Sequence, residues 1–158
     1  FNDVVVSVSL IVGGILLIWV DNKVQSKASQ VDVLENIPIK NAFYIGLVQC
    51  LSMIPGTSRA AATIVGGVFN KLDKKQATEF SFLLAIPTMF AATGYDLLKT
   101  PIDFTADQWK LLAIGLVLAA ISAWFAVKIF LNLVDKYGFK PFGYYRIALG
   151  FIYLILMT

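Results

Sequence analysis

Histidine is absent from this 158-residue chain, and cysteine occurs once, as Cys50. Without histidine, the chain has no side chain whose ordinary pKa lies near neutral pH. A single cysteine excludes an internal disulfide and most metal-ligand clusters, and its apolar neighbours indicate a small core residue. Charged residues are also scarce, at 15% of the chain against ~25% in an average soluble domain. The chain is therefore neither disordered, nor a disulfide-stabilised scaffold, nor a nucleic-acid-binding arm.

Apolar residues, by contrast, make up 58% of the chain, and its mean hydropathy is +0.77. A chain of 158 residues encloses too little interior to bury this surplus, so much of it must face lipid. The composition predicts an all-α integral membrane protein. The net charge of +3 is modest. In a membrane protein, the distribution of charges among the loops is more informative than their sum, because it indicates the orientation of the spans.

Four apolar segments predict helices that cross the membrane, because about 20 apolar residues are needed to span a hydrocarbon core of roughly 30 Å. Polar stretches between them predict extramembrane loops. In the first span, Gly13 and Gly14 predict close contact with another helix; in the second, Pro87 predicts a kink. The spans are residues 4–20, 80–95, 111–127 (with an extension to 134) and 144–157, and the loops are 21–40, 71–79, 97–110 and 135–142.

A further apolar stretch, residues 42–70, contains a single charge, Arg59, and is interrupted in its middle. The interruption reads Ile-Pro-Gly-Thr-Ser-Arg at residues 54–59. The proline ends a preceding helix and the glycine allows a turn, while the threonine or the serine is placed to cap a following helix. The pattern predicts two half-helices that meet at a polar turn.

The lysines indicate whether this interrupted segment crosses the membrane or re-enters it. If it re-enters, eight loop lysines lie on one side and two on the other, whereas a crossing segment gives five on each side. Only the re-entrant arrangement shows the bias expected for cytoplasmic loops, so the sequence predicts a hairpin that enters from the cytoplasm. Non-helical backbone at membrane depth needs a surrounding of protein or a polar cavity. The eight lysines are Lys23, Lys27, Lys40, Lys71, Lys74, Lys75, Lys136 and Lys140, and the two are Lys99 and Lys110.

Arg59 is the main candidate for function, because a charge between two apolar half-helices costs at least ~2.5 kcal/mol on insertion scales. Its planar guanidinium suits a phosphate group, and the start of the second half-helix supplies free N–H groups and a positive dipole end. Ser58 and Thr63 add hydroxyl groups on the same side. The alternative is structural: the hydroxyls cap the helix, and Arg59 extends to the membrane interface.

Other polar residues in the apolar segments give weaker signals. Gln49 lies in the first half-helix, where a buried amide can bridge helices. Arg146 follows two tyrosines at the start of the last span, a position typical of an interfacial anchor. No apolar segment carries two carboxylates on one helix face, the arrangement that metal binding or base catalysis needs. The sequence therefore predicts no metal ligands in this chain.

The segment 46–59, extended to Thr63, resembles a signature block of the undecaprenyl-diphosphatase family, the bacitracin-resistance proteins. The family block reads PGxSRSxxT, and Ala60 stands where the family commonly has serine. Two further stretches, 80–87 and 141–150, look similar to family blocks and occur in the same order. The residues of the first block that match are Pro55, Gly56, Ser58, Arg59 and Thr63.

The resemblance implies a fold built from inverted repeats, each with a re-entrant hairpin. Residues 1–158 are then expected to form a single membrane domain, the C-terminal portion of a longer chain that lacks the first repeat. In the family, that first repeat carries a block of acidic residues and a histidine, neither of which occurs in this sequence. About four transmembrane helices and one re-entrant helical hairpin are expected in the part that is present.

The resemblance also implies an enzyme, which hydrolyses undecaprenyl diphosphate to the monophosphate, recycles the lipid carrier of cell-wall synthesis and confers bacitracin resistance. On this analogy Arg59 clamps the diphosphate, Ser58 is a nucleophile or a phosphate ligand (water being the other nucleophile), and Thr63 donates a hydrogen bond. The substrate-binding residues are expected to be Gln49, Gly56, Thr57 and Arg146.

The remaining implications concern the cofactor, the partners and the location. A divalent cation, expected to be Mg²⁺, and the general base are expected to be held by carboxylates absent from this chain. The expected partners are a polyprenyl diphosphate lipid, the membrane and the missing N-terminal repeat; homodimer formation is left open, and nucleic acid is not expected. The location is the bacterial plasma (inner) membrane, as a multi-pass protein.

Two other functions fit the same sequence features. A lipid or anion transporter also uses re-entrant hairpins and repeats, since a fold does not fix a function. A non-catalytic membrane fragment would need neither a base nor a metal. Flux across vesicles without hydrolysis favours the transporter, and an acidic pair followed by a histidine upstream of Phe1 favours the enzyme.

The lysine distribution places the loop at 71–79 in the cytoplasm and the loop at 97–110 outside. Single-cysteine variants at Lys74 and Asp103, made without Cys50, test this topology by labelling intact cells with a membrane-impermeant thiol reagent. We expect labelling at position 103 and none at position 74. Labelling at 74 without labelling at 103 would overturn the topology.

Overall fold

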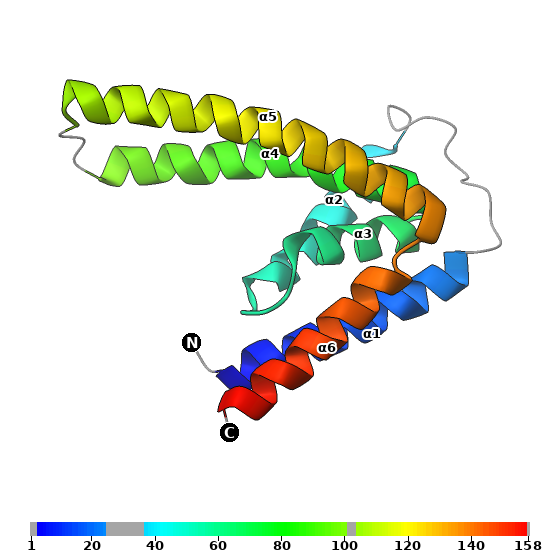
Figure 1. Cartoon of the computed structure of the whole chain (residues 1–158). Helices are drawn as coiled ribbons and strands as arrows, with labels where there is room; N and C mark the ends of the chain where they lie inside the picture. Colours follow the sequence, from blue (N-terminus) through cyan, green and yellow to red (C-terminus); the bar gives the residue numbers. More distant parts are fainter. Residues whose placement is uncertain (1–2, 25–36, 101–103, 158) are drawn as a thin grey trace.

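A computed structural model describes residues 3–24, 37–100 and 104–157. Within these ranges every regular element is a helix, and the helices run antiparallel in pairs (Figure 1). The elements are α1 (Asp3–Val24), α2 (Ile39–Gln49), the 3-10 helix η2 (Cys50–Met53), α3 (Arg59–Phe69), α4 (Lys74–Lys99), α5 (Ala106–Tyr137) and α6 (Lys140–Met157).

Three of the described helices, α1, α4 and α5, are long and apolar enough to cross a membrane. Their outer surfaces carry large apolar side chains, such as Leu116 of α5, which is 72% exposed. Such a surface needs an apolar surrounding, which lipid provides. The chain is thus an all-α membrane protein, as its composition predicts. The fourth predicted span lies within α6, an 18-residue helix that packs along α1.

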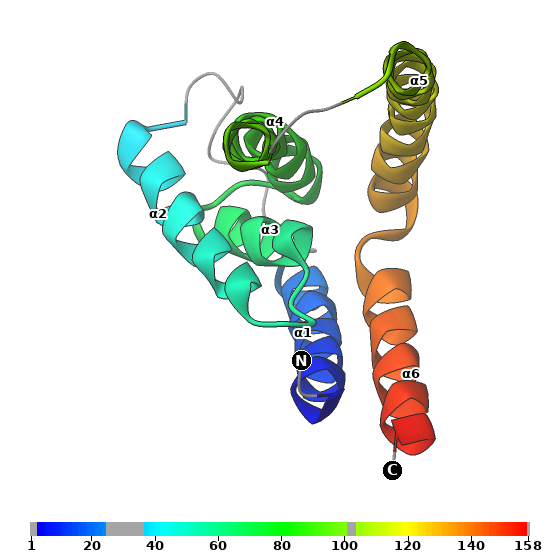
Figure 2. The same ribbon diagram turned by 90° about the vertical axis from the view of Figure 1, so that its left-hand side faces the viewer.

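Helices α1 and α6 form the most closely packed pair, and the start of α1 and the end of α6 lie at the same end of it (Figures 1 and 2). Glycines make this approach possible. A methyl group on Gly14 would lie 2.7 Å from the carbonyl oxygen of Gly143, and one on Gly150 would lie 3.0 Å from the carbonyl oxygen of Ser7. The predicted close contact at Gly13 and Gly14 is confirmed.

Helices α2 and α3 form a hairpin that packs between the α1–α6 pair and α4 (Figure 1). Gly66 of α3 lies against Val48 of α2, and Gly67 lies against Ala77 of α4. The buried core gathers where these helices meet the end of α5, so the hairpin is held on several sides. The core residues are Leu17, Ile45, Ala61, Ile64, Leu72, Ala77, Val134 and Phe139.

Several helices extend into stretches that were predicted to be loops, so the predicted boundaries at 71–79, 97–110 and 135–142 are wrong. Capping boxes explain two of these changes. At the start of α4, the Asp73 carboxylate accepts from the Gln76 N–H at 2.7 Å, and at the start of α5, Thr105 and Gln108 form the same reciprocal pair. In the middle of α4, the helix continues through Pro87.

The predicted loop at 21–40 also begins too early, because α1 continues to Val24 and residues 25–36 lie outside the described ranges. Asp21 is 1% exposed. Its Oδ1 accepts from Lys74 Nζ and from the Phe139 backbone N–H, both at 2.7 Å. The carboxylate therefore lies inside the fold and joins the end of α1 to the start of α4 and to the corner between α5 and α6.

The corner between α5 and α6 depends on Gly138. Its φ of +69° is in the left-handed region that favours glycine. A methyl group at this position would also collide with Oδ1 of Asp21. The chain can therefore turn from α5 into α6 and still present the Phe139 N–H to the carboxylate.

Substitution of Asp21 tests the importance of this junction. Asp21→Ala leaves the Lys74 ammonium and the Phe139 N–H without their acceptor, and breaking a buried ion pair costs about 3–5 kcal/mol. We expect a large fall in the thermal unfolding temperature in detergent micelles. Asp107→Ala is the matched control, since it breaks the exposed Asp107–Lys110 pair, which is worth at most about 1 kcal/mol. Equal unfolding temperatures for the two variants would contradict the assignment.

Candidate functional site

The interruption between α2 and α3 is a tight turn whose geometry follows from its sequence. The Thr57 N–H donates to the carbonyl oxygen of Ile54 at 3.0 Å. Gly56 has a φ of +86°, and a proline followed by such a glycine is typical of a type II turn. The turn lies directly against α1, because a methyl group on Gly56 would be 2.6 Å from the carbonyl oxygen of Val6. The predicted break between two short helices is confirmed.

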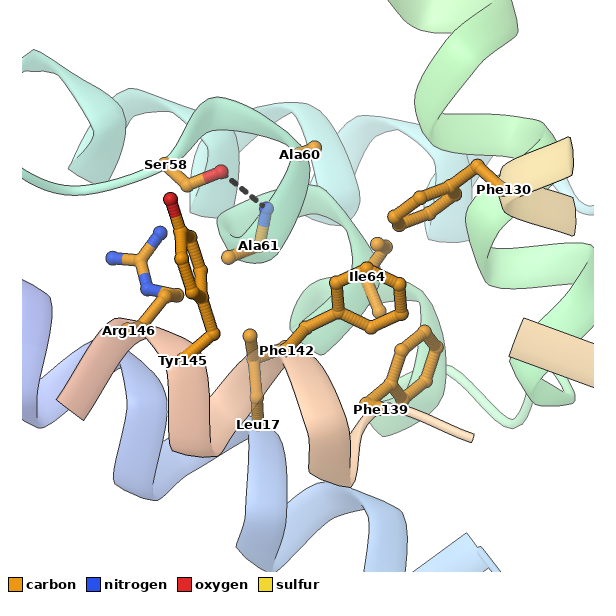
Figure 3. A pocket seen from close by; sticks show the side chains of 10 residues that line it. All are labelled: Leu17, Ser58, Ala60, Ala61, Ile64, Phe130, Phe139, Phe142, Tyr145 and Arg146. Carbon is orange, nitrogen blue, oxygen red and sulfur yellow. Dashed lines mark hydrogen bonds between the residues drawn. The ribbon is translucent and has the colours of Figure 1, made fainter. Parts of the chain in front are cut away.

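Ser58 caps α3, as its position in the sequence predicts. Its Oγ accepts from the Ala61 N–H at 3.2 Å (Figure 3). The N–H groups of Arg59 and Ala60 have no acceptor among the described residues. These two donors lie at the positive end of the helix dipole, where an anionic oxygen is favoured.

Arg59 is the first residue of α3, and its side chain is half-buried. Within the described part of the chain, no carboxylate or carbonyl group accepts from its guanidinium. Five strong donors and a positive charge therefore have no partner in the described ranges, and they belong to the residue whose own N–H is one of the two free N–H groups. This combination can bind a phosphate group through both charge and geometry.

Arg146 also reaches the turn, from α6. Its Nη2 donates to the carbonyl oxygen of Gly56 at 3.1 Å, and its guanidinium lies against Gly13, near the middle of α1. The interpretation of Arg146 as an interfacial anchor is therefore wrong, because the side chain points into the protein. Its Nε is buried and has no acceptor among the described residues. Arg146 thus fastens the turn and keeps one donor for another partner.

A pocket of about 200 Å³ brings Ser58 and Arg146 together. In Figure 3 the hydroxyl end of Tyr145 and the guanidinium of Arg146 both point toward Ser58. Sequence analysis missed Tyr145, since a tyrosine beside a span end gave only the signal of an interfacial aromatic residue. Apolar side chains of four helices close the rest of the pocket, namely Leu17, Ala60, Ala61, Ile64, Phe130, Phe139 and Phe142.

The other predicted site residues are placed differently. The Thr63 side chain points to α4, where its Oγ1 lies 2.6 Å from Ser81 Oγ, and the residue is 1% exposed. Thr63 and Arg59 do not line the pocket that contains Ser58. Gln49, the last residue of α2, is half-buried, and its amide makes no hydrogen bond within the described ranges. The structure therefore brings together Gly56, Ser58 and Arg146, with Arg59 beside them.

Two contacts with α1 show how far the turn lies from the start of α4. At the start of α4, Lys74 pairs with Asp21; at the turn, Gly56 touches Val6. These two α1 residues are separated by about 22 Å, given a rise of ~1.5 Å per residue. The chain from the turn to the start of α4 therefore extends along most of α1.

Acidic, cysteine and histidine side chains that lie together can hold a metal ion. In residues 3–24, 37–100 and 104–157, no three acidic, cysteine or histidine side chains lie close enough to hold an ion. The charged side chains near the turn belong to Arg59 and Arg146, which attract anions and repel cations. The donor set of this part of the chain therefore fits a phosphate group and does not fit Mg²⁺.

The fold and the turn define a helical membrane protein in which two short helices meet at a turn contacted by a half-buried arginine side chain. The sequence profile of the family described as "Bacitracin resistance protein BacA" matches residues 1–152. The chain belongs to this family, and the resemblance seen in its turn sequence is confirmed.

Curated relatives agree with this assignment. The chain is 48% identical over 157 residues to the undecaprenyl-diphosphatase of Persephonella marina, an alignment that covers 99% of the chain and 62% of the relative. It is 49% identical over 152 residues to the undecaprenyl-diphosphatase of Aquifex aeolicus, covering 96% of the chain and 59% of the relative. The chain thus spans about three fifths of the length of these relatives.

Gly56 should tolerate no side chain. Gly56→Ala places a methyl group against the Val6 backbone and forces an alanine to a φ of +86°, a conformation that costs about 1–3 kcal/mol. We expect a lower thermal unfolding temperature in detergent micelles. Gly115→Ala on α5 is the control, because nothing lies within 4 Å of the added methyl group. A control variant less stable than Gly56→Ala would refute this description of the turn.

Proposed function

We propose that this chain is the phosphate-binding part of an enzyme that hydrolyses undecaprenyl diphosphate to undecaprenyl phosphate and inorganic phosphate. The carrying observation is the guanidinium of Arg59, which has no acceptor among the described residues and belongs to the first residue of α3, whose own N–H is one of two free donors there. The names of the relatives support the choice of substrate. Through this reaction the protein recycles the lipid carrier of cell-wall synthesis and confers bacitracin resistance.

In the proposed reaction, a nucleophile attacks the terminal phosphorus while the bond to the bridging oxygen breaks. Catalysis then depends on placing the diphosphate and on neutralising charge as it develops on the phosphate oxygens. Arg59 and the first N–H groups of α3 bind one phosphate, and Arg146 offers its free Nε to the other. Ser58 or a water molecule is the nucleophile.

The proposal extends to the arrangement in the bacterial plasma membrane. Helices α2 and α3 have 11 residues each, or about 16 Å at a rise of ~1.5 Å per residue. This is too short for a hydrocarbon core of roughly 30 Å. A re-entrant hairpin with four spans around it, α1, α4, α5 and α6, agrees with these lengths and with the lysine bias. The turn then lies beyond the middle of the membrane, within reach of a substrate on the outer face.

The general base and the divalent cation are proposed to belong to carboxylates outside this sequence, because the cationic turn does not fit a metal ion. When bound, Mg²⁺ would neutralise phosphate charge. The residues of this chain bind and orient the diphosphate, and the apolar helix surfaces accept the polyprenyl tail. The proposed partners are therefore the lipid substrate, the membrane and the family's first repeat.

Removal of the guanidinium tests the proposal. In the natural protein that contains this chain, Arg59→Ala should lower kcat/KM for phosphate release from a prenyl diphosphate by about 100-fold or more, the usual loss when a transition-state donor is removed. Arg59→Lys should recover only part of this loss, since an ammonium group cannot bind two oxygens in a planar fork. The assay measures released phosphate in detergent micelles.

The control for these variants is Lys110→Ala, which removes an exposed cation at the start of α5. Its kcat/KM should equal that of the parent protein. Activity of Arg59→Ala near the parent level would refute the role of Arg59. Lipid or anion flux across vesicles without phosphate release would favour the transporter instead.

A further inference from the structure

Two hydroxyl groups form a cross-helix hydrogen bond beneath the turn between α2 and α3. Thr63 Oγ1 on α3 lies 2.6 Å from Ser81 Oγ on α4, and the two residues are 1% and 6% exposed. Thr63 Oγ1 also donates to the carbonyl oxygens of Arg59 and Ala60, both at 3.0 Å. If Ser81 donates to Thr63 and Thr63 donates to a carbonyl oxygen, both hydroxyl protons have an acceptor, whereas the reverse direction leaves the Ser81 proton without one among the described residues.

Ser81 is unusual among the hydroxyl residues of α4. Thr78 donates to the carbonyl oxygen of Lys74, and Thr88 donates to carbonyl oxygens of its own helix at 2.9 and 3.0 Å. Such bonds within one helix fix nothing outside it. Ser81 bonds instead to a different helix, and Thr63 is its one partner among the described residues. Its hydroxyl is therefore used to join α4 to α3.

The bond acts on the turn of helix that carries the phosphate-binding groups. Ser81 fixes the Thr63 hydroxyl, and that hydroxyl holds the carbonyl group of Arg59, the residue with the free guanidinium. In a low-dielectric interior such a chain of hydrogen bonds is strong, and an unpaired hydroxyl is costly. Without Ser81, Thr63 loses its donor, and the first turn of α3 loses its connection to the long helix α4.

We propose that Ser81 is a positioning residue for phosphate binding, acting through Thr63 on Arg59 and the first turn of α3. The proposal rests on the proposed function, because it concerns the same turn and the same diphosphate group. It assigns to α4 a part in substrate recognition that none of the predicted site residues implied.

The test is a double-mutant cycle in the natural protein that contains this chain. Ser81→Ala should lower kcat/KM for a prenyl diphosphate by about tenfold, and Thr63→Val should lower it at least as much, because it also removes the bonds to the Arg59 and Ala60 carbonyl oxygens. The double variant should lose no more than Thr63→Val alone, because Ser81 acts through the Thr63 hydroxyl. Each single variant should also weaken the inhibition by inorganic diphosphate, in proportion to its loss of kcat/KM. Unfolding temperatures are measured in parallel, so that losses are referred to folded protein.

Two matched variants separate positioning from a general effect on the helix. Ser81→Thr keeps the hydroxyl, and its extra methyl group has room in the adjoining cavity of about 380 Å³, which Ser81 helps to line; its kcat/KM should stay within about threefold of the parent value. Thr88→Val removes a hydroxyl that bonds only within α4, and its kcat/KM should equal that of the parent. Additive losses in the cycle, or an unchanged kcat/KM in Ser81→Ala, would overturn the proposal.

If the proposed hydrolysis is wrong, a binding measurement still tests the positioning role of Ser81. If the parent protein releases no phosphate, binding of inorganic diphosphate is measured directly by calorimetry on the same variants. Weaker binding by Ser81→Ala than by Thr88→Val would then support the positioning role and refute the hydrolysis. Equal binding by the parent and Ser81→Ala, or no binding by the parent, would overturn the positioning role.

Discussion

The carboxylate of Asp21 joins three parts of the chain that are far apart in sequence. It accepts from the ammonium of Lys74 at the start of α4 and from the N–H of Phe139 at the α5–α6 corner. A buried carboxylate is stable only when charge and hydrogen bonds compensate its lost hydration. Every long helix thus has an end at or next to this junction. The hairpin begins to extend along α1 from here, so the position of its turn depends on it.

From this junction outward, the structure holds the turn between α2 and α3, the proposed phosphate site, from several sides. Val6 of α1 packs against Gly56, Arg146 of α6 donates to the Gly56 carbonyl group, and Ser81 of α4 bonds to the Thr63 hydroxyl. Arg146 thereby fixes the backbone of the turn, while the Arg59 guanidinium has no partner among the described residues. Groups held in this way before a ligand arrives bind it with a smaller entropic cost.

The sequence predicted the features that depend on neighbouring residues. The hairpin break follows from a proline, a glycine and a capping serine within five positions, and the close approach of α1 follows from Gly13 and Gly14. The capping boxes at Asp73 and Thr105 are equally local, and they start α4 and α5 several residues before the apolar runs that predict these helices. The positions of Asp21 and Arg146 could not be predicted, because their partners are 118 and 90 residues away. A charge near the end of an apolar run looks the same whether it faces water or a distant carbonyl group.

The strength of the hydrogen bond that caps the start of α3 depends on the charge of a single atom, Ser58 Oγ. Ser58 Oγ already accepts from the Ala61 N–H, and a hydrogen bond to an ionised oxygen is roughly twice as strong as one to a neutral oxygen. If Ser58 attacked phosphorus in the proposed reaction, an alkoxide on this oxygen would tighten the first turn of α3, and the phosphoryl group bound next would bring anionic oxygens to the same helix end. With water as the nucleophile, the cap would keep one strength throughout the proposed reaction. The stiffness of this single helical turn would thus distinguish the two nucleophiles.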